Sequence, residues 1–433
     1  MKDKFIKSTI ILIIGGFITK LLGLFIKIIM TRTIGIEGIS LYMLILPTFS
    51  LAMTITNLSM PIAVSKLISE DKYNNKNILF NTIPISIIIN LITIIILILS
   101  SKYLAINLLH DERCIYPIIA ISFTLPFISM SNIIRAYFFG KQKMLPHVIS
   151  NIIEQITRIF LIGIITPYLI KISIKSAVCG LILVNIISET ISFIILFIFL
   201  PNKLTLTNED ILPNKNYIKK ILDISIPNTS GRIIANIFYF FEPIILTFVL
   251  LDNNFSKEYI TTEYGIIEGY ILPLITLPNF FTIAISNSLL PTISNYFAKR
   301  NLKAIKRKLK QSLSISLFIG ICTIILLFIF PDFFLKLIYN TNLGKNYLLI
   351  LLPVFIIYYI SPSLSSILHG INESKKLVRN ELIGILIKIL SICIFPYFKL
   401  GIYSLIIGII LDIIITNLLN CLSIKKVFST FPQ

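Results

Sequence analysis

The chain has 433 residues, of which 56% are hydrophobic and 14% are charged, with a mean hydropathy of +0.90. Soluble domains are about 45–50% apolar and about 25% charged, so this composition excludes a cytosolic enzyme. Lys and Arg outnumber Asp and Glu by 39 to 20. In a membrane protein such an excess sets topology and does not indicate a nucleic-acid partner. We therefore expect an all-α, multi-pass protein of the cell membrane.

No motif indicates an attached catalytic module or a bound cofactor. The five cysteines form no CxxC pair and the three histidines are far apart, so neither a disulfide framework nor a metal or haem site is expected. The ATP-binding string GxxxxGK[ST] and the hydrolase string GxSxG are both missing from the sequence. The first apolar run exceeds twenty residues without a cleavage site, which predicts a retained helix. We expect a protein that is not an enzyme.

Apolar runs of about 20 residues, the length that crosses a bilayer, occur about twelve times. Only Lys399, Leu400 and Gly401 separate the last two. The expected spans are residues 8–30, 41–68, 78–100, 114–139, 148–170, 176–200, 218–250, 266–290, 312–334, 347–368, 381–398 and 402–423.

Basic residues are unevenly distributed over the connecting segments. Counted with an inside N-terminus, 24 lie on the inner side and nine on the outer side. The positive-inside rule then places both termini in the cytoplasm. The stretch 299–310 is expected to form a short surface helix, either binding anionic lipid headgroups or serving as an ordinary basic loop. The polar interruption near mid-chain predicts two six-helix lobes, 1–203 and 218–433, joined by a cytoplasmic linker, 204–217.

A faint repeat relates the two halves. Gly35-Ile-Glu-Gly38 precedes Pro47 and Pro61, and Gly265-Ile-Ile-Glu-Gly269 precedes Pro273, Pro278 and Pro291. Paired spans that proline or glycine interrupts at corresponding places indicate the binding cavity of a transporter. Because the repeats run in the same direction, the lobes should be related by an axis along the membrane normal.

Two strings in these repeats resemble a known family. GGFITKLLGLFIKIIMTRTIGIEGISLYMLILPTFSLAMTITNLSMPIAVSKLISE (15–70) and YGIIEGYILPLITLPNFFTIAISNSLLPTISNYFAKRN (264–301) resemble the stage V sporulation protein B and polysaccharide export family of the MOP flippase superfamily. The resemblance implies a two-lobe, V-shaped transporter that moves a lipid-linked sugar precursor by alternating access, for peptidoglycan of the cell wall or spore cortex. Relatives often carry more helices or longer loops, which leaves the substrate open.

Three cations within spans are candidates for binding the substrate headgroup. Lys20 and Lys27 lie seven residues apart on one face of the first helix, and Arg232 lies in the seventh. Charged residues inside a membrane need a partner, a water-filled cavity or a helix end. Facing a cavity, the three would suit a pyrophosphate, and the resemblance to lipid II flippases supports this role. The alternative is that Lys27 extends to the interface and that Arg232 pairs with an acid.

Acids within spans allow several roles. Glu154 and Arg158 have the spacing of a structural helical ion pair. Glu242, Glu189 and Asp412 are candidates for coupling to Na⁺ or H⁺, although Lys388 could neutralise Asp412. Glu37 and Glu268 occupy matching places in the repeat. They could form an outer gate or only stabilise helix ends.

These observations favour a monomeric flippase for an undecaprenyl-pyrophosphate-linked glycan, with membrane lipids as its surroundings. A multidrug or cation antiporter of the same superfamily is the first alternative, and such a protein would prefer an acidic cavity. A membrane scaffold for glycan assembly, without transport, is the second. A scaffold would leave the charges within the spans without a purpose.

Overall fold

The computed structural model describes residues 2–70, 73–201 and 214–430, and in this part of the chain every regular element is a helix. The α-helices in chain order are α1 (Lys2–Asn57), α2 (Met60–Ser69), α3 (Asn75–Tyr103), α4 (Ile115–Gly140), α5 (Met144–Ile172), α6 (Ile174–Ile198), α7 (Lys215–Asp252), α8 (Lys257–Gly265), α9 (Leu272–Thr276), α10 (Asn279–Ala298), α11 (Leu302–Ile329), α12 (Pro331–Tyr339), α13 (Lys345–Gly370), α14 (Ser374–Ile394) and α15 (Tyr403–Thr430). Between them lie the π-helical segments η1 (Leu104–Leu108) and η5 (Ile266–Ile271) and the 3₁₀ segments η2 (Glu112–Cys114) and η6 (Phe395–Phe398).

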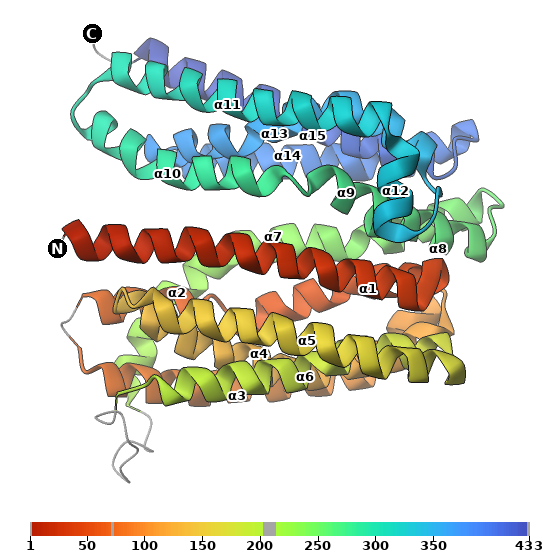
Figure 1. Cartoon of the computed structure of the whole chain (residues 1–433), viewed down its shortest axis with the longest axis horizontal. Helices are drawn as coiled ribbons and strands as arrows, with labels where there is room; N and C mark the ends of the chain where they lie inside the picture. Colours follow the sequence, from red (N-terminus) through yellow and green to blue (C-terminus); the bar gives the residue numbers. More distant parts are fainter. Residues whose placement is uncertain (1, 71–72, 202–213, 431–433) are drawn as a thin grey trace. The chain divides into compact units, whose positions relative to one another are not determined.

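The continuous element α1 contains two membrane spans. A straight helix of its 56 residues would be about 84 Å long at about 1.5 Å per residue, against about 30 Å of hydrocarbon. Gly35 interrupts it with φ 64° and ψ −169°, a conformation that only glycine adopts readily. Figure 1 shows the result: α1 leads away from the N-terminal end, and the chain has returned to that end by α2.

The described residues provide the twelve spans predicted from the sequence. Ten helices, α1 counted once, are long and apolar enough to cross a membrane. The segment from α8 to α10 adds an eleventh, bent by 57° at Leu277 and Pro278. Dividing α1 at Gly35 gives the twelfth. Each half has one break beside a proline, at Leu58 and Ser59 before Pro61 in the first half and at Leu277 and Pro278 in the second. The breaks are not at matching places of the repeat, because Pro47 lies within α1 and Pro291 lies within α10.

The sequence predicted a span over 312–334 and a separate surface helix before it, whereas the structure has one continuous helix over both. The helix α11 begins at Leu302, where the Asn301 side chain accepts a hydrogen bond from the Ala304 amide at 3.0 Å. The basic stretch therefore forms the first turns of α11 itself, because Lys and Arg are good helix formers. The span ends at Ile329, and Pro331 starts the short helix α12.

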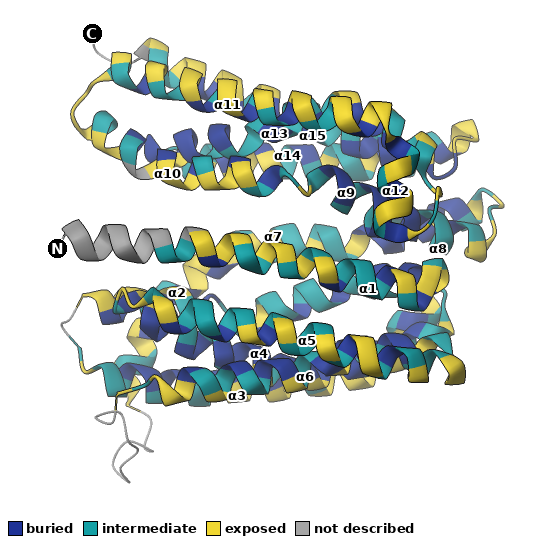
Figure 2. Cartoon of the chain, in the orientation of Figure 1, coloured by how far each residue is buried: buried dark blue, intermediate teal, exposed yellow. Residues whose placement is uncertain are grey.

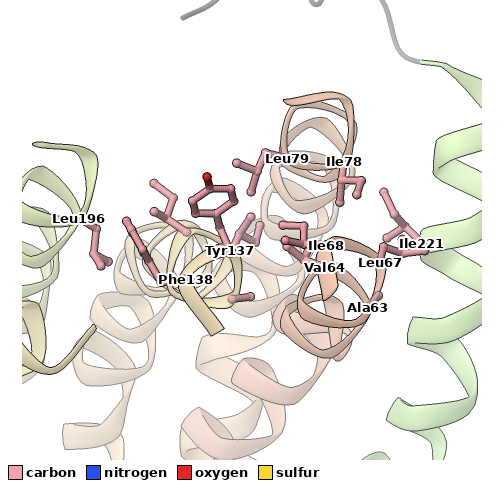
Figure 3. Packing of buried hydrophobic residues seen from close by; sticks show 13 residues of the cluster. Ala63, Val64, Leu67, Ile68, Ile78, Leu79, Tyr137, Phe138, Leu196 and Ile221 are labelled. Atoms are coloured by element: carbon pink, nitrogen blue, oxygen red, sulfur yellow. The ribbon is translucent and has the colours of Figure 1, made fainter. Parts of the chain in front are cut away.

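The chain divides into two compact units, residues 1–241 and 242–433, and the division falls within α7. The expected linker, 204–217, lies outside the described residues up to position 213. In the first unit, one apolar cluster joins five helices, α2, α3, α4, α6 and α7 (Figure 3). It packs Ile68 of α2 and Leu79 of α3 against Tyr137 of α4, with Ile221 of α7 beside them.

The helices carry large exposed apolar side chains, as lipid-facing helices do. Leu99 of α3 is 78% exposed and Phe318 of α11 is 69% exposed. Figure 2 shows exposed residues along much of α11. Soluble proteins rarely expose continuous apolar patches of this kind. The pattern agrees with a multi-pass membrane protein.

Candidate functional site

The break between α1 and α2 is the starting point of the site in the first unit. Leu58 (φ 41°) and Ser59 (φ 46°) both adopt the left-handed region, which is uncommon for residues other than glycine. Pro61 has no backbone N–H and fits the first turn of a helix but not its middle. The chain therefore leaves the helical path here and resumes it at Met60.

A cavity of about 240 Å³ opens beside this break. Its polar lining includes Ser50 and Asn57 of α1, Ser59, Asn132 of α4 and Arg232 of α7, and no Asp or Glu is among the residues that line it. Asn132 donates a hydrogen bond to the Asn57 side-chain oxygen at 3.2 Å. The Ser59 hydroxyl is buried and has no hydrogen-bond partner among the described residues. The cavity thus offers hydroxyl and amide groups together with one cation.

Arg232 supplies that cation. Its backbone carbonyl accepts a hydrogen bond from the Asn236 side chain at 3.0 Å, and Asn236 in turn accepts one from Ser50 at 2.6 Å. The bond from Ser50 joins α1 to α7 beside the cavity, and the bond to Arg232 lies within α7. Arg232 is exposed, lines the cavity and makes no ion pair within the described part of the chain.

The two lysines grouped with Arg232 by the sequence do not line this cavity. Lys20 is exposed and Lys27 is half-buried, both on the first part of α1. The structure therefore brings one of the three proposed headgroup cations to the polar cavity of the first unit.

A charge network that sequence reasoning missed lies elsewhere in the first unit. Arg135 of α4 lies 2.5 Å from a Glu154 oxygen on α5 and 3.2 Å from a Glu189 oxygen on α6, and it also donates to the Ser192 hydroxyl. Arg158 contacts the second Glu154 oxygen at 2.7 Å. The pair expected between Glu154 and Arg158 is present as one edge of a four-residue network. An arginine in the middle of a span was the available signal, but its partners lie on other helices.

The second unit holds a buried ion pair between Lys388 of α14 and Glu242 of α7, at 2.7 Å. Lys388 therefore forms its hydrogen bond with Glu242, where the sequence suggested Asp412. Asp412 instead accepts a hydrogen bond from Thr416, one turn further along α15, at 3.0 Å. One Glu242 oxygen has no hydrogen-bond partner among the described residues. A coupling cation at Glu242 would have to compete with the lysine ammonium.

Of the two glutamates of the repeat, Glu37 belongs to the first unit and Glu268 to the second. Glu37 lies 2.5 Å from Arg113, which also contacts Asp111 at 2.7 Å and lies in η2, directly before α4. These side chains are partly exposed, and their ion pairs join α1 to the segment before α4. Glu268 lies in η5 of the second unit. Over the described residues, no group of three or more His, Cys, Asp or Glu side chains is placed to hold a metal ion.

The sequence as a whole is similar to known membrane proteins. A family model described as polysaccharide biosynthesis protein matches residues 5–297, and a MatE model matches residues 269–394. The chain is 31% identical to stage V sporulation protein B of Bacillus subtilis (strain 168), over 98% of this chain and 84% of that protein. It is 25% identical to the lipid II flippase MurJ of the same organism, over 90% and 77% of the two chains.

Solved structures share the fold. An inward-facing multidrug resistance MATE family transporter of the MOP superfamily superposes with a TM-score of 0.76, at 15% identity and with 96% of each chain covered. A MOP superfamily transporter from Pyrococcus furiosus, described as having a binding pocket of reverse polarity, gives a TM-score of 0.62 at 18% identity, covering 100% of this chain and 97% of its own. The chain is thus a multi-pass membrane protein of the polysaccharide biosynthesis protein family, within the MOP superfamily.

Proposed function

We propose that the chain moves an undecaprenyl-pyrophosphate-linked glycan precursor across the cell membrane, for cell-wall or spore cortex peptidoglycan, by alternating access. The observation that carries the proposal is the polar cavity of the first unit, which is lined by Arg232, a cation without an ion pair among the described residues. Relatives named as a sporulation protein and as a lipid II flippase support the same class of substrate.

The chemistry of the cavity suits an anionic sugar-bearing headgroup. A guanidinium binds phosphate oxygens through paired, charge-assisted hydrogen bonds. The hydroxyl of Ser59 and the amides of Asn57 and Asn132 can donate to and accept from sugar hydroxyls or phosphate oxygens. In this proposal Lys20 and Lys27 attract the headgroup from other positions along α1.

The absence of acids from the cavity lining argues against an antiporter for cationic drugs. Such a substrate would need an unpaired carboxylate to replace its hydration. The buried acids Glu154 and Glu189 are paired with arginine, and Glu242 is paired with lysine. Of the three acids proposed for coupling to Na⁺ or H⁺, Asp412 alone is hydrogen-bonded to a hydroxyl and not to a cation.

The test is a flipping assay in proteoliposomes that compares an undecaprenyl-linked glycan with a cationic drug. We expect transport of the glycan only, and a loss of roughly tenfold or more for Arg232→Ala, because a charged hydrogen bond contributes about 1.5–3 kcal/mol. Lys20→Ala should weaken transport in the same direction. Lys219→Ala, an exposed lysine on the same helix α7 away from the cavity, is the matched control and should transport normally.

Full glycan transport by Arg232→Glu at normal membrane levels would refute the role of the cavity. Transport of the drug in place of the glycan would favour the antiporter.

A further inference from the structure

A second, larger cavity lies in the second unit and is not part of the site above. It has a volume of about 460 Å³ and lies between the first turns of α11 and the last turns of α15. Its walls include Lys306, Leu309 and Leu313 on α11 and Ile424, Lys425 and Phe428 on α15. Buried Leu364 of α13 belongs to its floor. The volume is within the range of small-molecule sites, about 300–1,000 Å³.

This cavity, a groove between α11 and α15, has both apolar and charged walls. Leu309, Leu313 and Leu364 belong to or pack against one apolar cluster of the second unit, which also contains Ile424. Lys306 and Lys425 are exposed, and the Lys306 ammonium lies 5.8 Å from the centre of the Phe428 ring. An apolar groove with two lysines at its edge can bind an amphiphile that has an apolar chain and an anionic headgroup.

The cations of the groove lack acidic partners. Neither Lys306 nor Lys425 makes an ion pair within the described part of the chain, and neither α11 nor the last two turns of α15 contains an Asp or Glu. The first ten residues of α11, Leu302 to Gln311, include five basic residues. Over the described residues, no acidic side chain supplies their counter-charge.

The two lysines also lie where a lipid headgroup would be. Lys306 precedes the apolar part of α11, and Lys425 follows the apolar part of α15. Both therefore mark the same membrane boundary, while Leu313 and Leu364 lie further toward the apolar side. Basic residues at such a boundary attract anionic lipids of the adjacent leaflet.

We infer that this groove is a binding site for an anionic phospholipid, with the phosphate between Lys306 and Lys425 and one acyl chain along Leu309, Leu313 and Leu364. The bound lipid supplies the counter-charge that the described residues do not provide, and it fills the apolar space between α11 and α15. The site does not depend on the identity of the transported substrate.

Native mass spectrometry of the full-length protein in detergent tests the site, with phosphatidylglycerol and phosphatidylcholine as probes. We expect one tightly retained phosphatidylglycerol and no equivalent phosphatidylcholine. In the double variant Lys306→Gln/Lys425→Gln the retained phosphatidylglycerol should bind at least roughly tenfold more weakly. The matched control is Lys303→Gln/Lys310→Gln, which removes the same charge from exposed positions on α11 that do not line the groove.

Cys421 provides a second readout, because it lines the groove and its side chain is exposed. Phosphatidylglycerol should slow alkylation of Cys421 by N-ethylmaleimide and leave the rate at exposed Cys322 unchanged. In the Lys306→Gln/Lys425→Gln protein this protection should disappear.

Three results would overturn the inference. Equal phosphatidylglycerol affinity in the two double variants would indicate a diffuse basic surface. Equal retention and protection by phosphatidylcholine would indicate a groove without headgroup recognition. Displacement of phosphatidylglycerol by undecaprenyl phosphate at a much lower concentration would assign the groove to the polyprenyl lipid and not to a phospholipid.

Discussion

The guanidinium of Arg135 on α4 and the carboxylate of Glu154 on α5 lie 2.5 Å apart, although 19 residues separate them in the sequence. The same guanidinium reaches Glu189 on α6, and Glu154 also binds Arg158. Two arginines thus neutralise two glutamates at the meeting point of three helices. Glu154 and Glu189 therefore hold α4, α5 and α6 together, and neither offers an unpaired carboxylate to a cationic substrate.

Replacing Arg135 with methionine should strongly destabilise the protein. Glu189 would lose its cation and Glu154 would keep only Arg158, and an unpaired buried charge typically costs about 3–5 kcal/mol. The measurement is thermal unfolding of the purified protein in detergent, together with its level in the membrane.

Arg158→Met is the matched control for this prediction. Arg158 is more exposed, at 21% of its side chain against 12% for Arg135, and Glu154 would keep its bond to Arg135. Arg158→Met should therefore lower the stability of the protein clearly less than Arg135→Met does. Equal losses for the two variants would contradict a network centred on Arg135.

The Glu242 and Lys388 pair should behave as a structural unit. Glu242→Gln or Lys388→Met alone leaves one buried charge without its partner, so each should lower the unfolding temperature. The double variant should recover most of the loss, because removing both charges of a buried pair is often neutral. Thermal unfolding of the four proteins forms a double-mutant cycle, and simple additivity of the two losses would show that the pair is not coupled.

Gly35→Ala should destabilise the turn between the two spans of α1. A Cβ at Gly35 meets no atom within 4 Å, so the cost arises only from the backbone conformation, φ 64° and ψ −169°, and should be about 1–3 kcal/mol. Gly23→Ala is the control, because it also has open space around its Cβ but lies in regular helix. Alanine there should be neutral or stabilising in unfolding measurements. A Gly35→Ala protein as stable as Gly23→Ala would contradict the strained turn.

The basic residues predict the orientation of the chain. Reporter fusions after Asn75, Lys143, Asn301 and Glu373 should report the cytoplasm, because the inner segments hold 24 basic residues against nine outside. Fusions after Asp111, Asn254 and Asn342 should report the exterior. All seven positions lie in or next to connections between helices. If the fusions in two neighbouring connections reported the opposite sides, the count of twelve spans would be wrong.

The sequence by itself determined the membrane class, the helical fold and the number of spans, because these depend on local runs of apolar residues in a bilayer. It also located the breaks beside Pro61 and Pro278, although not the continuous helix through Pro47, and the bond between Glu154 and Arg158, four residues apart on one helix. Helix ends were less well predicted, as at α11, where capping by Asn301 moved the start ten residues earlier.

Only the tertiary structure decided which charges meet. Arg135 and Glu189 are 54 residues apart, and Lys388 and Glu242 are 146 residues apart, so no spacing rule connects them. Asp412 was as plausible a partner for Lys388 in the sequence, but the packing of α14 brings the ammonium to Glu242. The same holds for Arg232, which reached the polar cavity while Lys20 and Lys27 did not. Helix periodicity gives the face on which a residue lies, whereas its partner depends on how separate helices pack.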